Sequence, residues 1–351
     1  MGSYRAAVIG CGRIGGDCGL LNMGSSRLES HAEAYKAWGS THLVAGCDPD
    51  EDSRLRFGEK WGITRLYADY REMLEREDLG IVSICTPVSN HAEIMTDLFA
   101  SKTIQGILLE KPVAIDVSEA TKMIEDAQIS SATIAVNYSR RYLSSYTEVY
   151  DMVRSGALGR IQHVRGLYTK GVVNNGSHFI DLLRFFFGEP ESLRVFPGAS
   201  THTGSFRLNS ECNNKKDPTL NFSVTYPEGF EAWGVGLDHS SFNVFDIDII
   251  GTEGRVVFTD LGHRRLFYRR EKTKAQYGFR QLAPEPEISS TDLSGATREA
   301  VKNLTESIES GRSPRCTLQD GRAAIALSLE LANMFANEMW SDREVPTLET
   351  L

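Results

Sequence analysis

The sequence lacks most of the features that mark membrane, secreted and nucleic-acid-binding proteins. Lys and Arg number 38 against 47 Asp and Glu, so the formal net charge is −9 and no broad basic surface is available for nonspecific nucleic-acid binding. No run of about 18 apolar residues is present to span a bilayer. The chain passes from Met1 into the apolar residues 6–9 without a charged region, a long apolar stretch or a cleavage site. These absences predict a cytoplasmic protein.

Cysteine is scarce and widely spaced. The six cysteines form no C-x-x-C pair, whereas zinc sites and the disulfide frameworks of small secreted domains need closer spacing or more cysteines per residue. We therefore expect reduced thiols and no bound metal. Five histidines also lack the spacing of metal ligands, and we interpret them as structural or surface residues: His42, His163, His202, His239 and His263.

The composition is that of an ordinary globular protein, with 41% hydrophobic and 24% charged residues. At roughly 100–200 residues per domain, a chain of 351 residues predicts two or three domains. It is long enough to bury more than one hydrophobic core.

A glycine-rich motif follows the first apolar run, residues 5–9. The pattern G-x-G-x-x-G directly after a buried strand is the dinucleotide-binding fingerprint. Its first glycine permits a tight turn, the second lets the backbone approach a pyrophosphate, and the third lets a helix pack on the strand. Three glycines in six residues also occur in plain turns, but the position after a strand favours the fingerprint. The expected cofactor contacts are Gly10, Gly12, Arg13, Ile14 and Gly15.

The acidic residue that completes this fingerprint comes late. Asp48 follows the apolar run 42–47, and it lies 33 residues after Gly15 instead of the usual 20 or so. Residues 16–30 look like a 15-residue insertion, whose removal leaves 18. Ser30 and Glu33 form a capping box, S-x-x-E, that predicts a delayed, re-routed helix from about His31.

Asp48 also bears on the choice of cofactor. A carboxylate at the end of the second strand binds the ribose hydroxyls of NAD and repels the 2′-phosphate of NADP. The sequence therefore favours NAD. NADP stays open, because Arg54 is close enough in sequence to bind a 2′-phosphate.

Strands and helices continue to alternate through the first third of the chain. Apolar strands are expected at 65–67, 81–85 and 107–109, with helices near 50–60, 69–76 and 90–100 between them. This alternation predicts a doubly wound parallel sheet, which binds ligands beyond the carboxyl ends of its strands. Four such ends carry candidate residues: Gly10–Gly15, Asp48, Thr86-Pro87 and Glu110-Lys111-Pro112.

The second half of the chain has a different pattern. Alternating or β-branched and aromatic segments with turn residues between them predict strands at 161–168, 220–226, 230–237, 243–250 and 255–259. Residues 209–218 read as an exposed polar loop, and 317–337 as a long helix with one apolar face.

Several short motifs, taken in order, resemble the Gfo/Idh/MocA oxidoreductases. They are Gly10–Gly15, Thr86-Pro87 with His91, Glu110-Lys111-Pro112, the N-x-x-R-R-like run Asn137–Tyr142, the G-x-H-x-x-D run Gly176–Asp181, and Phe245–Gly254. The resemblance implies a Rossmann domain at 1–120 and an α/β domain with a large, mostly antiparallel open sheet at 121–351. It also implies cofactor contacts from Thr86, Pro87, His91, Glu110 and Lys111, and a homodimer or homotetramer formed through the open sheet.

The resemblance further assigns the proton chemistry to Lys111 and His178. Lys111 would hydrogen-bond the reacting oxygen and stabilise a developing alkoxide, although an exposed loop lysine is the plain alternative. His178 would act as the acid/base partner, with Asp181 three residues later on the same helical face to support its imidazole. An ordinary i,i+3 contact between His178 and Asp181 on the helix, without a catalytic role, explains this spacing equally well. Lys111–Pro112 is a candidate cis peptide.

The chain departs from inositol-dehydrogenase-like members at one position. They carry Asp four residues before this histidine, and this chain has Asn174, an amide that can hydrogen-bond a hydroxyl but cannot act as a base. Further substrate contacts are expected from Arg141, Tyr168 and Asp181. With Arg140 and Lys170, Arg141 would suit a phosphorylated or acidic sugar. A structural role for the arginines, and simple packing for Tyr168, are equally consistent with the sequence.

The sequence therefore predicts an NAD-dependent dehydrogenase or ketoreductase, acting on a secondary alcohol of a sugar or cyclic polyol that is free, phosphorylated or nucleotide-linked. Two alternatives remain. One is a redox-neutral enzyme that oxidises a sugar transiently before elimination or hydrolysis, and the other is a non-catalytic dinucleotide sensor.

Overall fold

The computed structural model describes residues 3–17, 28–196, 203–207, 216–273, 278–285, 289–291, 293–337 and 343–344. The chain forms two compact units. Unit 1 comprises Met1–Tyr142 and Leu293–Arg322, and unit 2 comprises Leu143–Asp292 and Ala323–Leu351. Unit 1 thus takes in residues beyond 120, because a sixth strand and a late helix complete its core.

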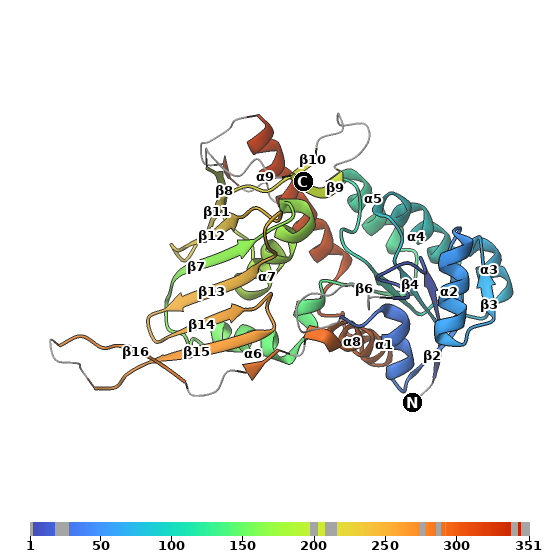
Figure 1. The fold of residues 1–351 in the computed structure, drawn as a ribbon, viewed down its shortest axis with the longest axis horizontal. Coiled ribbons are helices and arrows are strands. Elements are labelled where there is room, and N and C mark those ends of the chain that lie inside the picture. Colours follow the sequence, from blue (N-terminus) through green and yellow to red (C-terminus); the bar gives the residue numbers. More distant parts are fainter. Residues whose placement is uncertain are drawn as a thin grey trace. The chain divides into compact units, whose positions relative to one another are not determined.

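Unit 1 is a doubly wound parallel sheet, as predicted, with the strand order β3-β2-β1-β4-β5-β6 (Figure 1). The order reverses between β1 and β4, and ligands of such sheets bind beside that switch point. The strands are almost continuously apolar because helices cover the sheet. They are β1 (Tyr4–Ile9), β2 (Thr41–Cys47), β3 (Arg65–Tyr67), β4 (Ile81–Ile84), β5 (Gly106–Leu109) and β6 (Thr133–Val136).

The helices of unit 1 alternate with these strands, apart from one late helix that packs on α1, β5 and β6. Most begin at an acidic or hydroxyl N-cap, such as Asp50 before α2 and Asp116 before α5. They are α1 (His31–Ala37), α2 (Glu51–Trp61), α3 (Tyr70–Arg76), α4 (His91–Ala100), α5 (Val117–Ala127) and the late helix α8 (Ala296–Ser310).

The helix after the fingerprint is split in two by the insertion. Residues 12–17 form a helical turn, in which Gly16 N–H donates to Gly12 O (2.7 Å). The chain then leaves, and on its return the N–H groups of His31 and Ala32 donate to Ile14 O (3.1 Å) and Gly15 O (2.9 Å). In an uninterrupted helix residues 18 and 19 would make these bonds. The insertion is therefore 13 residues long, not 15, and the helix is interrupted on its own axis instead of being re-routed.

Hydrogen bonds to α1 and to the start of α8 hold the returning segment, residues 29 and 30, in place. Ser30 caps α1 as predicted, since its side chain accepts the N–H of Glu33 (3.2 Å). Glu29 N–H donates to Ser294 O (3.0 Å), and Thr297 at the start of α8 donates to Glu29 O (3.0 Å). Residues 18–27, most of the insertion, lie outside the described residues.

Unit 2 is built on a large, mostly antiparallel sheet in the order β16-β15-β14-β13-β7-β12-β11-β8-β18, with β17 paired to β15 (Figure 1). Among the described strands of this sheet, only β7 and β12 pair in parallel. The strands are β7 (Ile161–Tyr168), β8 (Ser192–Val195), β11 (Phe222–Thr225), β12 (Glu231–Gly236), β13 (Phe245–Gly251), β14 (Gly254–Thr259), β15 (Arg264–Arg270), β16 (Leu282–Pro284), β17 (Ser289–Ser290) and β18 (Arg343–Glu344).

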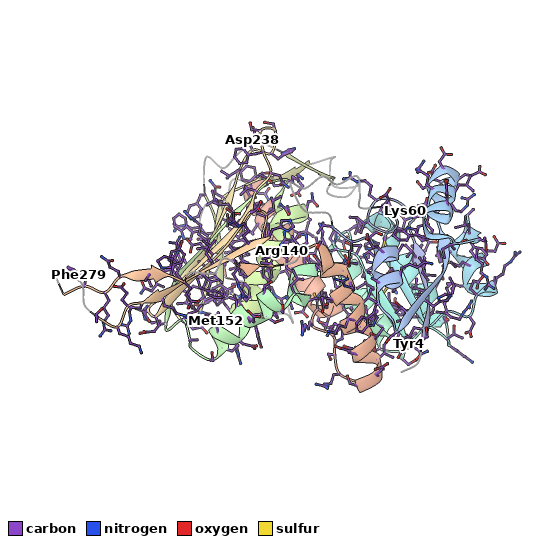
Figure 2. The ribbon with its side chains drawn as sticks, turned by 60° about the horizontal axis from the view of Figure 1, so that its bottom comes forward. Tyr4, Lys60, Arg140, Met152, Asp238 and Phe279 are labelled. Carbon is purple, nitrogen blue, oxygen red and sulfur yellow. The ribbon has the colours of Figure 1, made fainter. Side chains whose placement is uncertain are left out.

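One face of this sheet is buried by helices and the other is open. Burial alternates along β12 and β14, and the inward rings include Phe258, which stacks on Tyr146 of α6 at 4.1 Å. The helices are α6 (Ser144–Arg154), α7 (Ser177–Phe187) and α9 (Leu318–Ala336), the last as predicted. Figure 2 shows Phe279, 73% exposed, at the outer end of the β15–β16 hairpin.

The predicted loop 209–218 is only partly described. Residues 208–215 lie outside the described residues, and Lys216–Pro218 form β10, which pairs with β9 (Thr203–Arg207). No helix in the described part of the chain has the length and apolar character to cross a membrane.

The split helix predicts which deletion the fold tolerates. Removing residues 18–30 joins Asp17 to His31 in helical register, so we expect a folded protein. Its free energy of unfolding should fall by only a few kcal/mol, roughly 0.5–2 for the Ser30 cap and about 1 for each of the two Glu29 hydrogen bonds. Denaturant unfolding measures it. Removing 18–29 instead leaves one extra residue and rotates α1 by about 100°, which should abolish cooperative unfolding. Equal stabilities of the two deletions would contradict a single interrupted helix.

Candidate functional site

The glycine-rich turn lies between the ends of β1 and β4. Gly10 has φ +95°, and a Cβ there would lie 2.7 Å from the Cys85 backbone. A Cβ on Gly15 would lie 1.9 Å from Gly10 O, so this position admits no side chain. A Cβ on Gly12 would meet no described atom within 4 Å. The loop is thus tight at its two ends and open in the middle, which is the shape a pyrophosphate needs.

Asp48 is fixed at the end of β2 with its carboxylate beside this turn. Its Oδ2 accepts the N–H of Cys11 (2.8 Å) and its Oδ1 the N–H of Asp50 (2.9 Å). The guanidinium of Arg54 donates to the main-chain oxygens of Asp48 (2.7 Å) and Pro49 (3.4 Å). Arg54 therefore supports the backbone of the β2–α2 loop.

A cavity of about 180 Å³ opens between the glycine-rich turn and α2. Three of its nine lining residues are basic (Arg13, Arg56 and Lys60) and one is acidic, Asp17, which pairs with Lys60 (2.5 Å). A positive lining beside the turn suits the negative charge of a dinucleotide.

Thr86 and Pro87 follow β4, and His91 lies behind them. Thr86 Oγ1 is buried and has no hydrogen-bond partner among the described residues. The ring of His91, 1% exposed, lies between two main-chain oxygens, Thr86 O at 3.1 Å and Val113 O at 3.3 Å. Burial lowers its pKa against the effect of these carbonyls and of Glu110. His91 thus contacts the main chain of two loops, the one after β4 and the one after β5.

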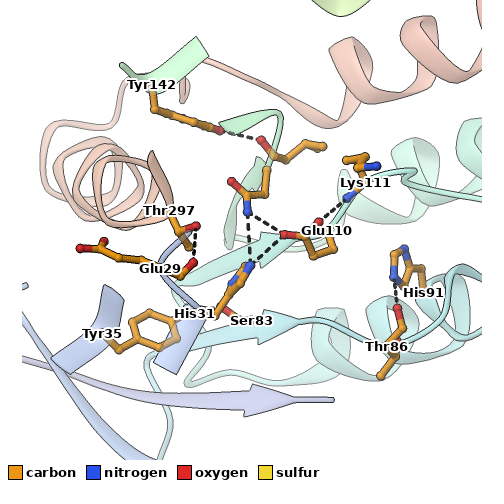
Figure 3. A network of polar contacts seen from close by, with 12 residues as sticks. Glu29, His31, Tyr35, Ser83, Thr86, His91, Glu110, Lys111, Tyr142 and Thr297 are labelled. Carbon is orange, nitrogen blue, oxygen red and sulfur yellow. Dashed lines mark hydrogen bonds and ion pairs between the residues drawn. The ribbon is translucent and has the colours of Figure 1, made fainter. Parts of the chain in front are cut away.

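Glu110, at the end of β5, is the centre of a buried polar network (Figure 3). Its Oε1 accepts from Asn137 Nδ2 (2.6 Å) and lies 2.9 Å from His31 Nε2. Its Oε2 accepts the N–H of Lys111 (3.2 Å). Burial raises the pKa of Glu110, but His31, Asn137 and Lys111 outweigh it, so that the net pKa is lowered and the carboxylate is charged.

His31 was not predicted as part of the site. It lies in the first turn of α1, 0% exposed, with Nδ1 2.8 Å from Ser83 Oγ, which in turn contacts Tyr35 Oη at 2.6 Å. The sequence holds one signal for it. Once 13 residues are removed, His31 falls in the second turn of the fingerprint helix, which faces the strand ends.

Lys111 is half-buried at the end of β5, and the Lys111–Pro112 peptide is cis, as predicted. Asn137, at the end of β6, contributes a second buried acceptor, since its Oδ1 has no hydrogen-bond partner among the described residues. Lys111 thus follows the strand that lies between β4 and β6 in the sheet, and the residues after those two strands, Thr86 and Asn137, each carry a buried oxygen without a described hydrogen-bond partner.

In unit 2 the predicted residues gather where β7 ends. Lys170 has φ +68°, and the chain then enters a π-helical turn, Val172–Gly176, that leads into α7. The buried carboxylate of Asp217 accepts the N–H groups of Val173 (3.0 Å) and Asn174 (2.8 Å). Asp217 was not predicted, and it fixes the backbone that carries Asn174.

His178 lies half-buried in the first turn of α7, with its ring edge-on to Phe245 at 6.3 Å. Asp181 is one helical turn further and 1% exposed. Tyr168 is 0% exposed, and its hydroxyl donates to Leu220 O (2.6 Å), which favours the packing role over contact with a substrate.

Arg141, in unit 1, is 3% exposed. Its guanidinium pairs with Asp320 (3.1 Å) and donates to Arg315 O (3.3 Å). This partner set favours the structural alternative.

No group of three or more His, Cys, Asp or Glu side chains that could hold a metal ion occurs among the residues that the structure describes.

The residues of unit 1 fit a dinucleotide. The open space above Gly12, the fixed carboxylate of Asp48 and the two unused buried oxygens of Thr86 and Asn137 all lie at carboxyl ends of the parallel strands. Unpaired buried polar atoms are costly, and a bound ligand would satisfy them.

Gly12 gives a direct test of this fit. Because a Cβ there meets no described atom within 4 Å, Gly12→Ala should leave the melting temperature unchanged and weaken NAD binding about tenfold or more by crowding the pyrophosphate. Calorimetric titration with NAD measures the affinity. Gly39→Ala, at another open glycine, is the matched control. Unchanged NAD affinity in Gly12→Ala would show that the pyrophosphate lies elsewhere.

Comparison with known proteins agrees with this geometry. Residues 4–138 match the model of the GFO_IDH_MocA family, described as "Oxidoreductase family, NAD-binding Rossmann fold". Myo-inositol 2-dehydrogenase of Thermotoga maritima is 24% identical, over 92% of this chain and 93% of its own. The scyllo-inositol 2-dehydrogenase (NAD(+)) of Bacillus subtilis is 22% identical, over 95% of each chain.

A solved structure extends the likeness in fold. Levoglucosan dehydrogenase in complex with NADH and L-sorbose superposes with a TM-score of 0.76 at 17% identity, over 99% of this chain and 100% of that one. The predicted fold class and the predicted NAD cofactor are confirmed. The first 138 residues thus match the NAD-binding Rossmann model of the Gfo/Idh/MocA oxidoreductases, and nearly the whole chain is similar to dehydrogenases named for inositols.

Proposed function

We propose that the protein is an NAD-dependent dehydrogenase or ketoreductase that acts on a secondary alcohol or ketone of a sugar, sugar derivative or cyclic polyol. The family supplies the oxidoreductase class, and the relatives named above act on inositols and levoglucosan according to their names. The observation that carries the proposal is the end of β5, where Glu110 holds the backbone of Lys111 between the unused oxygens of Thr86 and Asn137.

The proposed chemistry divides between a hydride and a proton. When bound, NAD accepts a hydride from the carbinol carbon. Lys111 hydrogen-bonds the oxygen that becomes an alkoxide and stabilises its negative charge. His178 exchanges the proton, and its half-buried ring with Asp181 one turn away suits an acid/base group. Asn174 hydrogen-bonds a substrate hydroxyl and transfers no proton.

The contacts of two arginines indicate which class of substrate and which cofactor the protein binds. Arg141 is engaged by Asp320, which removes one of the cations that suited a phosphorylated substrate, so we propose a neutral sugar or polyol. Arg54 is engaged by the Asp48 and Pro49 carbonyls, which leaves the Asp48 carboxylate to select NAD over NADP.

A panel of neutral sugars, inositols, sugar phosphates and nucleotide sugars, each with NAD and NADP, tests the function by absorbance at 340 nm. We expect NADH to accumulate in proportion to a neutral substrate consumed. Lys111→Met should then lower kcat by at least about 10³-fold with NAD affinity nearly unchanged, because the lysine stabilises only the transition state.

The exposed Lys102→Met, in the same unit, is the matched control and should keep wild-type kcat. Substrate turnover without net NADH would favour the redox-neutral alternative. Near-normal turnover by Lys111→Met would refute the role of Lys111.

We also propose that the chain is a homodimer or homotetramer that associates through unit 2. The open sheet face exposes Trp233 (39%), and the β15–β16 hairpin exposes Phe279 (73%) and Leu282 (38%). On the same face, Asp246 Oδ1 is buried without a hydrogen-bond partner among the described residues.

Light scattering coupled to size exclusion tests this association. We expect a particle of two or four times 39.0 kDa, and a shift toward the monomer in Trp233→Glu. Leu55→Glu, on exposed α2, is the control and should leave the mass unchanged. A wild-type particle of one chain would contradict the proposal.

A further inference from the structure

The buried cluster behind Lys111 includes a residue that reaches it only because the insertion ends in register. His31 lies next to Glu110 through Nε2 (2.9 Å) and to Ser83 through Nδ1 (2.8 Å), and Ser83 contacts Tyr35 (2.6 Å). His31, Ser83 and Tyr35 are 0% exposed. Figure 3 labels all three beside Glu110. Four side chains from α1, β4 and β5 thus form a continuous line of polar contacts that ends at Glu110.

One arrangement of protons satisfies every atom in this line. Tyr35 donates to Ser83, Ser83 donates to His31 Nδ1, and His31 Nε2–H donates to Glu110 Oε1. Burial raises the pKa of Tyr35, so it keeps its proton. In this arrangement the Ser83 hydroxyl orients the imidazole from one side, and the Nε2–H of His31 is donated to the carboxylate.

The line has the composition of a Ser-His-Glu triad but not its function. Ser83 lies in the middle of β4, between the buried residues Val82 and Ile84, and no part of its side chain reaches the surface. A nucleophile must contact its substrate. The contacts of His31 instead lead toward Lys111.

We propose that His31 is a positioning residue, which holds the carboxylate of Glu110 so that its other oxygen fixes the Lys111 backbone. Asn137 is the second donor to the same Oε1, and its Nδ2 lies 3.3 Å from His31 Nε2. This inference rests on the proposed role of Lys111. On this proposal, the register in which the helix resumes after the insertion matters for catalysis, because it places His31 in the second turn of the fingerprint helix, beside Glu110.

The charges around Glu110 give the proposal a pH signature. The titratable groups that face Glu110 are His31 from α1, His91 from α4 and Lys111 beside it, with Asn137 as a neutral donor. Among the causes that lower the pKa of Glu110, the hydrogen bond from His31 is the largest. Removing that donor raises the pKa of Glu110 toward or above its ordinary value of 4.5.

Two conservative variants separate this contact from a merely structural role. The amide of Gln reaches as far as the Nε2 of His, and the amide of Asn only as far as Nδ1. His31→Gln therefore keeps the bond to Glu110, whereas His31→Asn keeps only the contact with Ser83. Neither variant titrates, so a comparison of the two is free of the imidazole's own protonation.

We expect His31→Gln to recover most of the wild-type kcat and His31→Asn to lose about 10²-fold, with KM and calorimetric NAD affinity changed little, because a displaced Lys111 weakens only the transition state. The acid limb of kcat should move to higher pH in His31→Asn alone. His42→Gln, at an exposed histidine of β2, is the control.

A second readout needs no cofactor or substrate. A carboxylate whose pKa is lowered by folding adds stability above its ordinary pKa, and this stability is lost as the pH falls through its native pKa. Below about pH 4.5 the melting temperature should therefore fall more steeply in wild type and His31→Gln than in His31→Asn. Equal kcat, acid limbs and acid slopes in the two variants would overturn the proposal.

So would a loss of melting temperature in His31→Asn at every pH with kcat unchanged, because that is the mark of packing alone. Full activity of Lys111→Met is a different result. It would refute the proposed role of Lys111 and leave the acid slopes free to report on the His31–Glu110 bond.

Discussion

The candidate site depends on one largely buried carboxylate, that of Glu110, whose side chain is 14% exposed. Glu110 accepts hydrogen bonds from three elements: His31 of α1, Asn137 at the end of β6 and the main chain of Lys111. A charged carboxylate away from water is tolerated only when such donors repay its desolvation. The three donors do so here, and in return the carboxylate fixes three strand and helix ends relative to one another.

The same constraint explains why the helix after the fingerprint survives an interruption. Its first turn is needed by the glycine-rich loop, and its second turn carries His31 and Tyr35 into the network. The chain can leave between the two turns because the hydrogen bonds of Ile14 and Gly15 are made again on its return. The contacts of Glu29 with the start of α8 hold the returning chain in place. If the chain resumed the helix in a different register after the insertion, the His31 side chain would point away from Glu110.

The sequence predicts the parallel sheet and the strand-end residues well, because apolar strands that are buried on both faces and end in Gly, Asp, Thr-Pro or Glu-Lys-Pro are local signals. It does not predict His31, whose partner Glu110 is 79 positions away and whose helical register is hidden by the insertion. It also leaves Arg141 and Tyr168 ambiguous. Their partners, Asp320 and Leu220, are distant in sequence, and only the fold shows that both side chains are already engaged.

The charge state of Glu110 tests the central claim most directly. Carbon-13 NMR of protein labelled at the glutamate side-chain carboxyl, with the Glu110 signal assigned by its loss in Glu110→Gln, follows this group through a pH titration. The three donors predict a midpoint below the ordinary value of 4.5, because they stabilise the charged form more than burial destabilises it. A midpoint at or above 4.5 would show that the network does not hold a charged carboxylate, and the account of how Lys111 is positioned would fail.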